Sequence, residues 1–141
     1  MIDVTDGSWI HKLPAYVMLF YALNNLIAAS GLMNNMMPTL FGTTEEALPL
    51  MQGPMGRMMF LTTGISCTVI GLLFLPTYPE KKSPALTKWT FQLFVGLNSV
   101  FTLGILPLMY DEGFMGNAGI AQYGVMNCIF IGIAVLALTR M

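Results

Sequence analysis

Carboxamide side chains are the residues of this sequence whose type and position could do chemistry. Asn24 and Asn25 lie side by side in the stretch FYALNNLIAASG, which carries no charge, and Asn98 and Asn127 lie in two later uncharged stretches. An amide donates and accepts hydrogen bonds but does not titrate in the physiological range. These residues can therefore hold a neutral polar group, but by themselves they cannot relay a proton.

The composition indicates the surroundings in which these amides lie. Of the 141 residues, 55% are hydrophobic and 9% are charged, whereas a typical soluble domain has about 25% charged residues. So little charge cannot cover a surface that faces water, and we expect the lipid bilayer to be the solvent. The net charge of −1 gives no reason to expect nucleic acid as a partner.

Charged residues divide the chain into four long uncharged segments, 13–44, 58–79, 89–110 and 113–139. Each can cross a bilayer once, since the hydrocarbon core needs about 20 apolar residues in a helix. We therefore predict an all-α fold, in which residues 1–141 form a single integral membrane domain of four transmembrane helices. Prolines and glycines near the segment ends place these helices at about 14–37, 55–75, 84–109 and 118–139.

The segment between the first two helices, about residues 35–54, is the one sizeable loop. It remains rather apolar, which is typical of chain that lies in the membrane interface or against a partner. We expect it to contain one short helix, which Pro49 ends.

Lysine and arginine residues predict the orientation. Five of the six basic residues fall on the side of the termini and the 76–88 loop, namely Lys12, Lys81, Lys82, Lys88 and Arg140. The other side holds Arg57 and most of the acidic residues. The positive-inside rule then places both termini on the cytoplasmic, matrix or stromal side.

The amides fall at a common depth when they are counted from the expected helix ends. Asn24, Asn25, Asn98 and Asn127 each lie within about one turn of a helix centre, and the second helix carries Ser66 near its own centre. Two interpretations stay open. These side chains form hydrogen bonds between helices, or they line a midplane pocket for a headgroup, a quinone or a pigment. No acid, base or histidine lies deep in any segment, which argues against a transporter.

The sole histidine, His11, precedes the first apolar stretch and could ligate a chlorophyll magnesium or a haem iron. It joins Asn24, Asn25, Asn98 and Asn127 as a candidate cofactor-binding residue, and chlorophyll, carotenoid or a bound lipid are the cofactors considered. The two cysteines, Cys67 and Cys128, lack the spacing of metal ligands. We therefore expect no metal site, no catalytic residue and no enzyme activity.

Small residues recur at helical spacing on two of the predicted helices. The second helix carries Gly64, Cys67, Thr68 and Gly71, and the fourth carries Gly124, Cys128 and Gly132. Such faces let two backbones approach closely within a membrane. Each face can serve either the internal bundle or a neighbouring subunit.

Two short motifs accompany this architecture. LFG follows the first span, and the second opens with an arginine-glycine pattern in GPMGRMMFLTTGISCTVIGLL. Together with four short-looped spans, they make the whole chain similar to the DoxX-like small membrane proteins. The resemblance implies a four-helix fold. Roles in that group are diverse, so no site residue is carried over.

Two functions follow as hypotheses. The lack of buried charge, the lack of an extramembrane domain and the small-residue faces favour a non-catalytic accessory subunit. It would scaffold or stabilise a larger energy-transducing complex in the thylakoid or the mitochondrial inner membrane, with a photosystem slightly favoured over a respiratory complex. Its partners would be other membrane subunits. The alternative is a DoxX-like protein that binds or processes a small lipophilic molecule such as a quinone.

Overall fold

Four long helices make up most of the chain. The computed structural model describes residues 9–32, 34–75 and 84–141, with the side chains of Trp9, His11 and Pro84 left out of that description. The long helices are α1 (Trp9–Ser30), α4 (Pro54–Phe74), α5 (Pro84–Val100) with its continuation, and α7 (Asn117–Leu138). After α5 the same rod continues through the π-helical segment η3 (Phe101–Ile105) into α6 (Leu106–Asp111).

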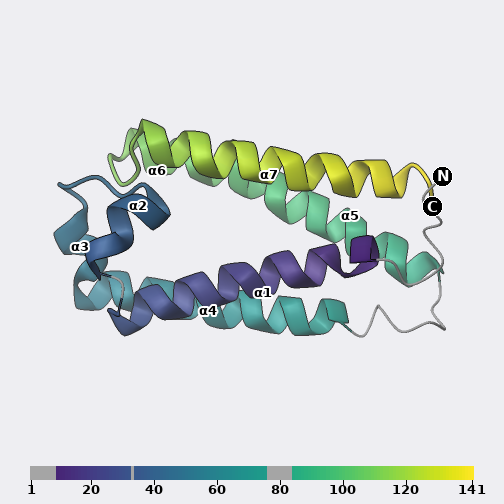
Figure 1. Cartoon of the computed structure of the whole chain (residues 1–141), viewed down its shortest axis with the longest axis horizontal. Coiled ribbons are helices and arrows are strands. Elements are labelled where there is room, and N and C mark those ends of the chain that lie inside the picture. The colour runs from purple at the N-terminus through teal and green to yellow at the C-terminus, as the bar shows by residue number, and fades with distance from the viewer. Residues whose placement is uncertain (1–8, 33, 76–83) are drawn as a thin grey trace.

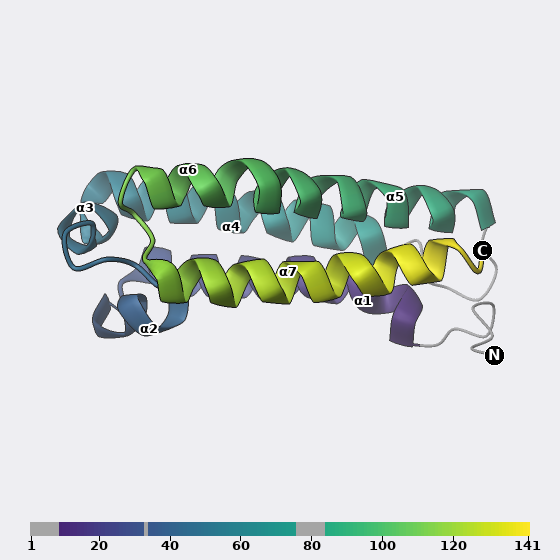
Figure 2. The same cartoon turned by 90° about the horizontal axis from the view of Figure 1, so that it is seen from above.

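These four rods confirm the predicted all-α membrane bundle. Each contains a stretch long and apolar enough to cross a bilayer, at Lys12–Ser30, Pro54–Phe74, Ala85–Asp111 and Asn117–Leu138. Within the described ranges no β-strand occurs. Figures 1 and 2 show the rods lying lengthwise beside one another.

The first helix differs from the expected range of 14–37. It begins earlier, at Trp9, with Pro14 inside it, and it ends at Ser30. Gly31 ends the helix because its φ of 77° is left-handed, and its N–H bonds to the carbonyl of Ala28 at 3.1 Å. The other long helices begin and end within about two residues of the expected positions.

The loop after α1 forms more helix than was expected. It contains a 3-10 turn, η1 (Asn34–Met36), and two short helices, α2 (Met37–Phe41) and α3 (Leu48–Gln52). The expectation that Pro49 ends a helix was wrong. Pro49 lies in the first turn of α3, where a missing N–H breaks no helical hydrogen bond.

The rods pair as two antiparallel hairpins, α1 with α4 and α5–α6 with α7. Two buried glycines bring α1 and α4 together. A Cβ atom on Gly64 would lie 2.8 Å from Leu26 Cγ, and one on Gly71 would lie 2.9 Å from Leu19 Cγ. This part of the predicted small-residue face therefore serves the internal bundle, as close backbone packing in membranes requires.

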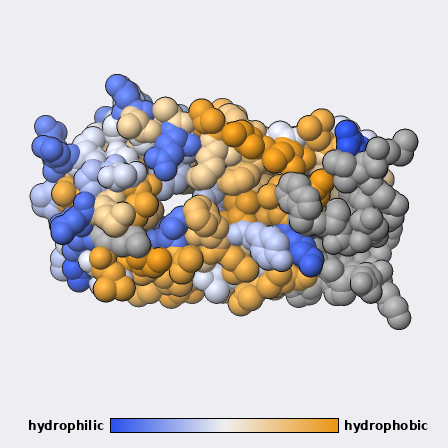
Figure 3. Space-filling model, in the orientation of Figure 1, coloured by the Kyte–Doolittle hydropathy of each residue, from blue (hydrophilic) through white to orange (hydrophobic). Residues whose placement is uncertain are grey.

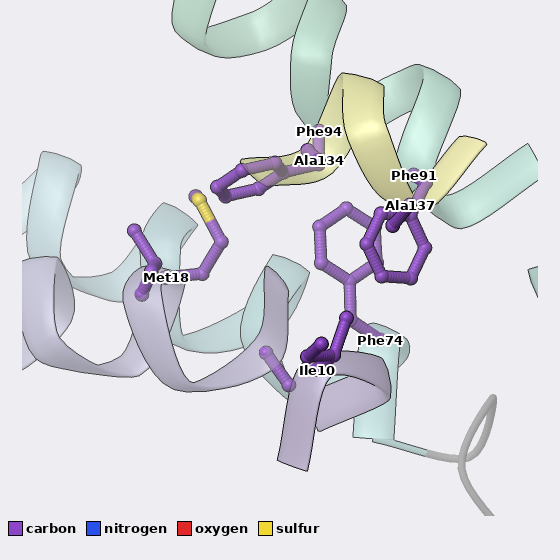
Figure 4. Close-up of a cluster of buried hydrophobic side chains, with 9 residues drawn as sticks. Ile10, Met18, Phe74, Phe91, Phe94, Ala134 and Ala137 are labelled. Carbon is purple, nitrogen blue, oxygen red and sulfur yellow. The ribbon is translucent and has the colours of Figure 1, made fainter. Parts of the chain in front are cut away.

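An aromatic core joins the two hairpins at the end that carries Lys12, Lys88 and Arg140, called the basic end below. The side chains of Phe74, Phe91 and Phe94 are almost completely buried there. Figure 4 shows Phe74 of α4 pointing toward Phe91 of α5, and Met18 of α1 pointing toward Phe94. Ala134 and Ala137 of α7 complete the core, and their small size lets the rings approach that helix.

A backbone contact joins the hairpins at the opposite end, where α2 and α3 lie. Residues 42–44 run beside residues 113–116 of the α6–α7 turn, and we call this contact the clasp. The N–H of Gly116 bonds to the carbonyl of Gly42 at 2.9 Å, and the N–H of Thr44 bonds to the carbonyl of Phe114 at 3.3 Å. The Thr44 hydroxyl also donates to the carbonyl of Gly113, at 2.5 Å.

The clasp needs glycine at Gly42 and at Gly119, which lies beside it in the first turn of α7. A Cβ atom on Gly42 would lie 2.1 Å from Gly119 Cα, a distance that no side chain can tolerate. Gly42 also has a φ of 62°, which residues with a side chain rarely adopt. The first turn of α7 is thereby fixed against the loop that follows α2.

Gly119→Ala is expected to open the clasp. The added methyl group would lie 2.9 Å from Gly42 Cα and 2.5 Å from Met115 Cγ. We expect the free energy of unfolding to fall by about 1–3 kcal/mol, as overpacking typically causes, when measured by denaturant titration in detergent micelles. Gly124→Ala on the same helix is the control, because nothing lies within 4 Å of its added Cβ. An equal fall in the free energy of unfolding of the two variants would contradict the role given to Gly119 in the clasp.

Candidate functional site

A cavity separates the two hairpins between the aromatic core and the clasp. Its volume is about 460 Å³, which lies within the usual range of small-molecule sites. Figure 3 shows the molecule hollowed between the upper and lower pairs of helices, beside α2. Every long rod and the clasp contribute to the wall.

The wall is largely apolar. Its apolar residues are Met18, Phe41, Met51, Met59, Phe60, Leu97, Phe101, Ile105, Met109, Phe114 and Met115. Its polar groups are fewer: Tyr21, Asn24, Asn25, Thr43, Thr63, Cys67, Asn98 and Tyr123. No charged side chain of the described residues is among them. An apolar wall with a few convergent polar groups is typical of sites for small organic molecules.

Three of the four predicted asparagines lie on this wall. Asn24 and Asn25 come from α1, and Asn98 comes from α5 on the facing hairpin. Asn127 of α7 is completely buried and is not among the lining residues. Three of the four residues that the sequence grouped thus lie around one space, although α1 is centred nearer residue 20 than the expected range placed it.

The hydrogen bonds of these amides separate the two interpretations that the sequence left open. Asn25 Nδ2 donates to the carbonyl of Tyr21 at 2.8 Å, and Asn98 Nδ2 donates to the carbonyl of Phe94 at 2.9 Å. Both bonds stay within one helix and join no neighbour. Within the described part of the chain, the side chain of Asn24 makes no hydrogen bond. These three residues therefore do not hold helices together.

Asn127 alone among the four forms a hydrogen bond between helices. Its Oδ1 accepts a hydrogen bond from the hydroxyl of Tyr21, which crosses from α1 to α7. Its Nδ2 is buried and has no partner among the described residues. The amide is held through its oxygen, and Tyr21 in turn forms part of the cavity wall.

Tyr123 forms a second polar link near the clasp. Its hydroxyl donates to the carbonyl of Leu40, in α2, at 2.9 Å. Tyr123 lies on α7 and lines the cavity. Tyr21 thus joins α1 to α7, and Tyr123 joins α7 to α2. Each tyrosine donates its hydroxyl proton in that bond.

The π-helical segment after Asn98 shapes the wall, and sequence reasoning missed it. Pro107 has no N–H to bond to Leu103, and the N–H of Leu106 bonds instead to Phe101, five residues earlier. The Thr102 hydroxyl donates to the carbonyl of Asn98 at 2.7 Å. The widened turn adds Phe101 and Ile105 to the wall. Such segments are frequent at functional sites, and the G-I-L-P sequence at 104–107 was the available signal.

Of the remaining sequence candidates, only Cys67 lies on the cavity wall. His11 belongs to the first turn of α1, at the basic end, and its side chain lies outside the described part of the chain. Cys67 lines the cavity as a free thiol, and Cys128 is exposed. Among the described residues, no group of three or more histidine, cysteine, aspartate or glutamate side chains could hold a metal ion.

Arg57 belongs to the first turn of α4, and its guanidinium lies beside the carboxyl end of α1. Its Nε donates to the carbonyl of Gln52 at 3.1 Å, and a Cβ atom on Gly31 would lie 2.8 Å from its Nη2. Within the described ranges it forms no ion pair. A guanidinium at the carboxyl end of a helix complements the partial negative charge there. Arg57 therefore stabilises the end of α1 and does not belong to the cavity.

Comparisons with protein-family models, with curated proteins and with solved structures found no match. The similarity to DoxX-like proteins therefore stays a prediction from the sequence.

Tyr21→Phe is expected to leave the Asn127 amide without any partner. An unsatisfied buried polar group costs about 1–3 kcal/mol, so the free energy of unfolding in micelles should fall by that amount. Tyr16→Phe on the same helix is the control, because Tyr16 is 53% exposed. The double variant Tyr21→Phe/Asn127→Leu should recover most of the loss, since both partners become apolar. Additive losses in the double variant would show that the two side chains are not coupled.

Proposed function

We propose that this chain is an integral membrane protein that binds a small, uncharged, lipophilic molecule in the cavity between its two hairpins. The cavity itself carries the proposal. It measures about 460 Å³ and is partly open to the surroundings of the bundle. A concave site of this size with an apolar wall and a few polar groups is typical of small-molecule sites.

The character of the wall supports the choice of ligand. A charged ligand would be costly to desolvate without an opposite charge, and no charged side chain of the described residues lines the cavity. Three amides and two tyrosines supply a small number of fixed polar contacts. Met59 and Ile105 line the wall and are 48% and 43% exposed, so part of the cavity wall also faces the surrounding lipid.

Filling the cavity should remove the ligand. Both threonines are exposed, but only Thr63 lies on the cavity wall. Thr63→Trp therefore adds an indole to the wall, whereas Thr62→Trp adds the same group to the neighbouring residue outside it. We expect organic extracts of the purified wild type and of Thr62→Trp to contain a small lipophile at about one molecule per chain by mass spectrometry. The extract of Thr63→Trp should lack it.

If the extract of Thr63→Trp contains the same molecules in the same amounts, then nothing specific fills the cavity.

A second candidate rests on a different surface, the outer face of α7. Gly124 and Gly132 have nothing within 4 Å of an added Cβ, and Cys128 between them is exposed. This small-residue stripe is free to pack against another membrane helix. It supports an accessory subunit that scaffolds a larger complex, with a photosystem slightly favoured over a respiratory complex and a location in the thylakoid or mitochondrial inner membrane. The bias of basic residues supports termini on the stromal or matrix side.

This second candidate predicts a stable assembly. Purified through this chain in mild detergent, the protein should migrate with other membrane subunits, and Gly132→Leu should release it while its helicity by circular dichroism stays unchanged. A wild-type chain that migrates alone as a monomer would exclude the scaffold role.

A further inference from the structure

We infer that the molecule bound in the cavity is a membrane lipid with an uncharged polar group and a long hydrocarbon chain, and that this chain leaves the cavity between α4 and the α5–η3 rod to lie in the bilayer. The inference rests on the proposed binding function and specifies the class of the ligand and its orientation. Two features of the wall support it, the position of its exposed residues and the position of its polar ones.

The exposed residues of the wall belong to two facing helices. Four wall residues have exposed side chains: Met59 and Thr63 of α4, Leu97 of α5 and Ile105 of η3. The other wall residues are half-buried or buried. Figures 1 and 2 together show that α4 faces the α5–α6 rod, as α1 faces α7. Because the four residues line the cavity and also reach the molecular surface, the cavity is open between α4 and the α5–η3 rod, and we call this gap the lateral opening.

The lateral opening lies within the membrane spans. Its residues on α4 belong to the span Pro54–Phe74, and those on the other rod belong to Ala85–Asp111. Thr63 stands nine residues after Pro54, which is about 13 Å along a helix, and a bilayer has a hydrocarbon core of about 30 Å. The opening therefore leads into lipid chains and not into water.

The polar residues of the wall are concentrated on the opposite side, where the molecule is also hollowed (Figure 3). Five of the eight belong to α1, the clasp and α7, namely Tyr21, Asn24, Asn25, Thr43 and Tyr123. At the lateral opening, Thr63 is the one polar residue among four. A polar group in the cavity thus has most of its hydrogen-bonding partners toward α1 and α7, and an apolar chain is best accommodated toward α4 and α5.

This arrangement suits an amphiphile that comes from the bilayer. Its polar group enters the cavity while its chain keeps its contacts with neighbouring acyl chains, so no large apolar surface has to cross water. A charged headgroup would be costly to desolvate, and no charged side chain of the described residues lines the wall. The ligand class is therefore a neutral lipid with a compact polar group.

A pair of photoreactive monoacylglycerols tests the orientation. Both have the same chain length, but one has its diazirine near the methyl end of the chain and the other has it on the glycerol. The purified protein is irradiated with each probe in micelles, with and without excess ordinary monoacylglycerol, and the labelled peptides are mapped by mass spectrometry. We expect the chain probe to label α4 and the α5–η3 rod and the glycerol probe to label α1 and α7, and we expect the excess lipid to suppress both.

Variants assign the path of the chain to the lateral opening. Ile105→Trp should lower the suppressible labelling by the chain probe about tenfold, since overpacking a site that the chain fills weakens binding by roughly that factor. Leu103→Trp on the same segment is the control, because Leu103 is exposed and lies outside the wall. Circular dichroism checks that each variant keeps its helices, and Leu97→Trp takes the place of Ile105→Trp if the latter does not fold. Labelling that is as strong in the opening variant as in the control would overturn the exit between α4 and α5.

The outcomes separate this inference from the function on which it rests. Suppressible labelling with the two patterns exchanged, or with the same peptides for both probes, overturns the orientation and leaves a lipid-binding cavity. If the excess lipid suppresses neither label, the assignment of a lipid with a long chain is wrong. The extracts of the wild type and of Thr63→Trp then decide separately whether a compact lipophile fills the cavity.

Discussion

The backbone contact between Gly42 and Gly119 is the constraint on which the cavity depends. The first hairpin is well packed on its own, since Gly64 and Gly71 let α1 and α4 approach closely. Between the hairpins, the aromatic core lies at the basic end and the clasp at the other. Because the hairpins are fixed at both ends, they can stay apart in the middle without separating or collapsing.

The middle of the bundle holds together through a few polar bonds. In a bilayer there is no water to satisfy polar groups, and apolar surfaces gain little from meeting each other. The bonds from Tyr21 to Asn127 and from Tyr123 to the carbonyl of Leu40 therefore have a large share in setting the distance between the hairpins. Each of these bonds uses the single hydroxyl proton of its tyrosine.

Short deviations from regular helix shape the same region. The π-helical segment Phe101–Ile105 exists because Pro107 interrupts the hydrogen-bond pattern of the third rod, and it begins three residues after Asn98. Thr102 satisfies the carbonyl of Asn98 locally. This interruption would weaken an isolated helix, but here it adds Phe101 and Ile105 to the cavity wall.

The sequence by itself determined the four spans and most of their approximate ends, because these follow from hydropathy and from the punctuation of each segment. Even so, it missed the end of α1 at Gly31, where a left-handed residue stopped a stretch that stays apolar. Only the tertiary structure decided that Asn24, Asn25 and Asn98 line a cavity while Asn127 is buried beside it. A side chain's partner depends on what the neighbouring helix brings to the same depth, and no periodicity within one helix contains that information.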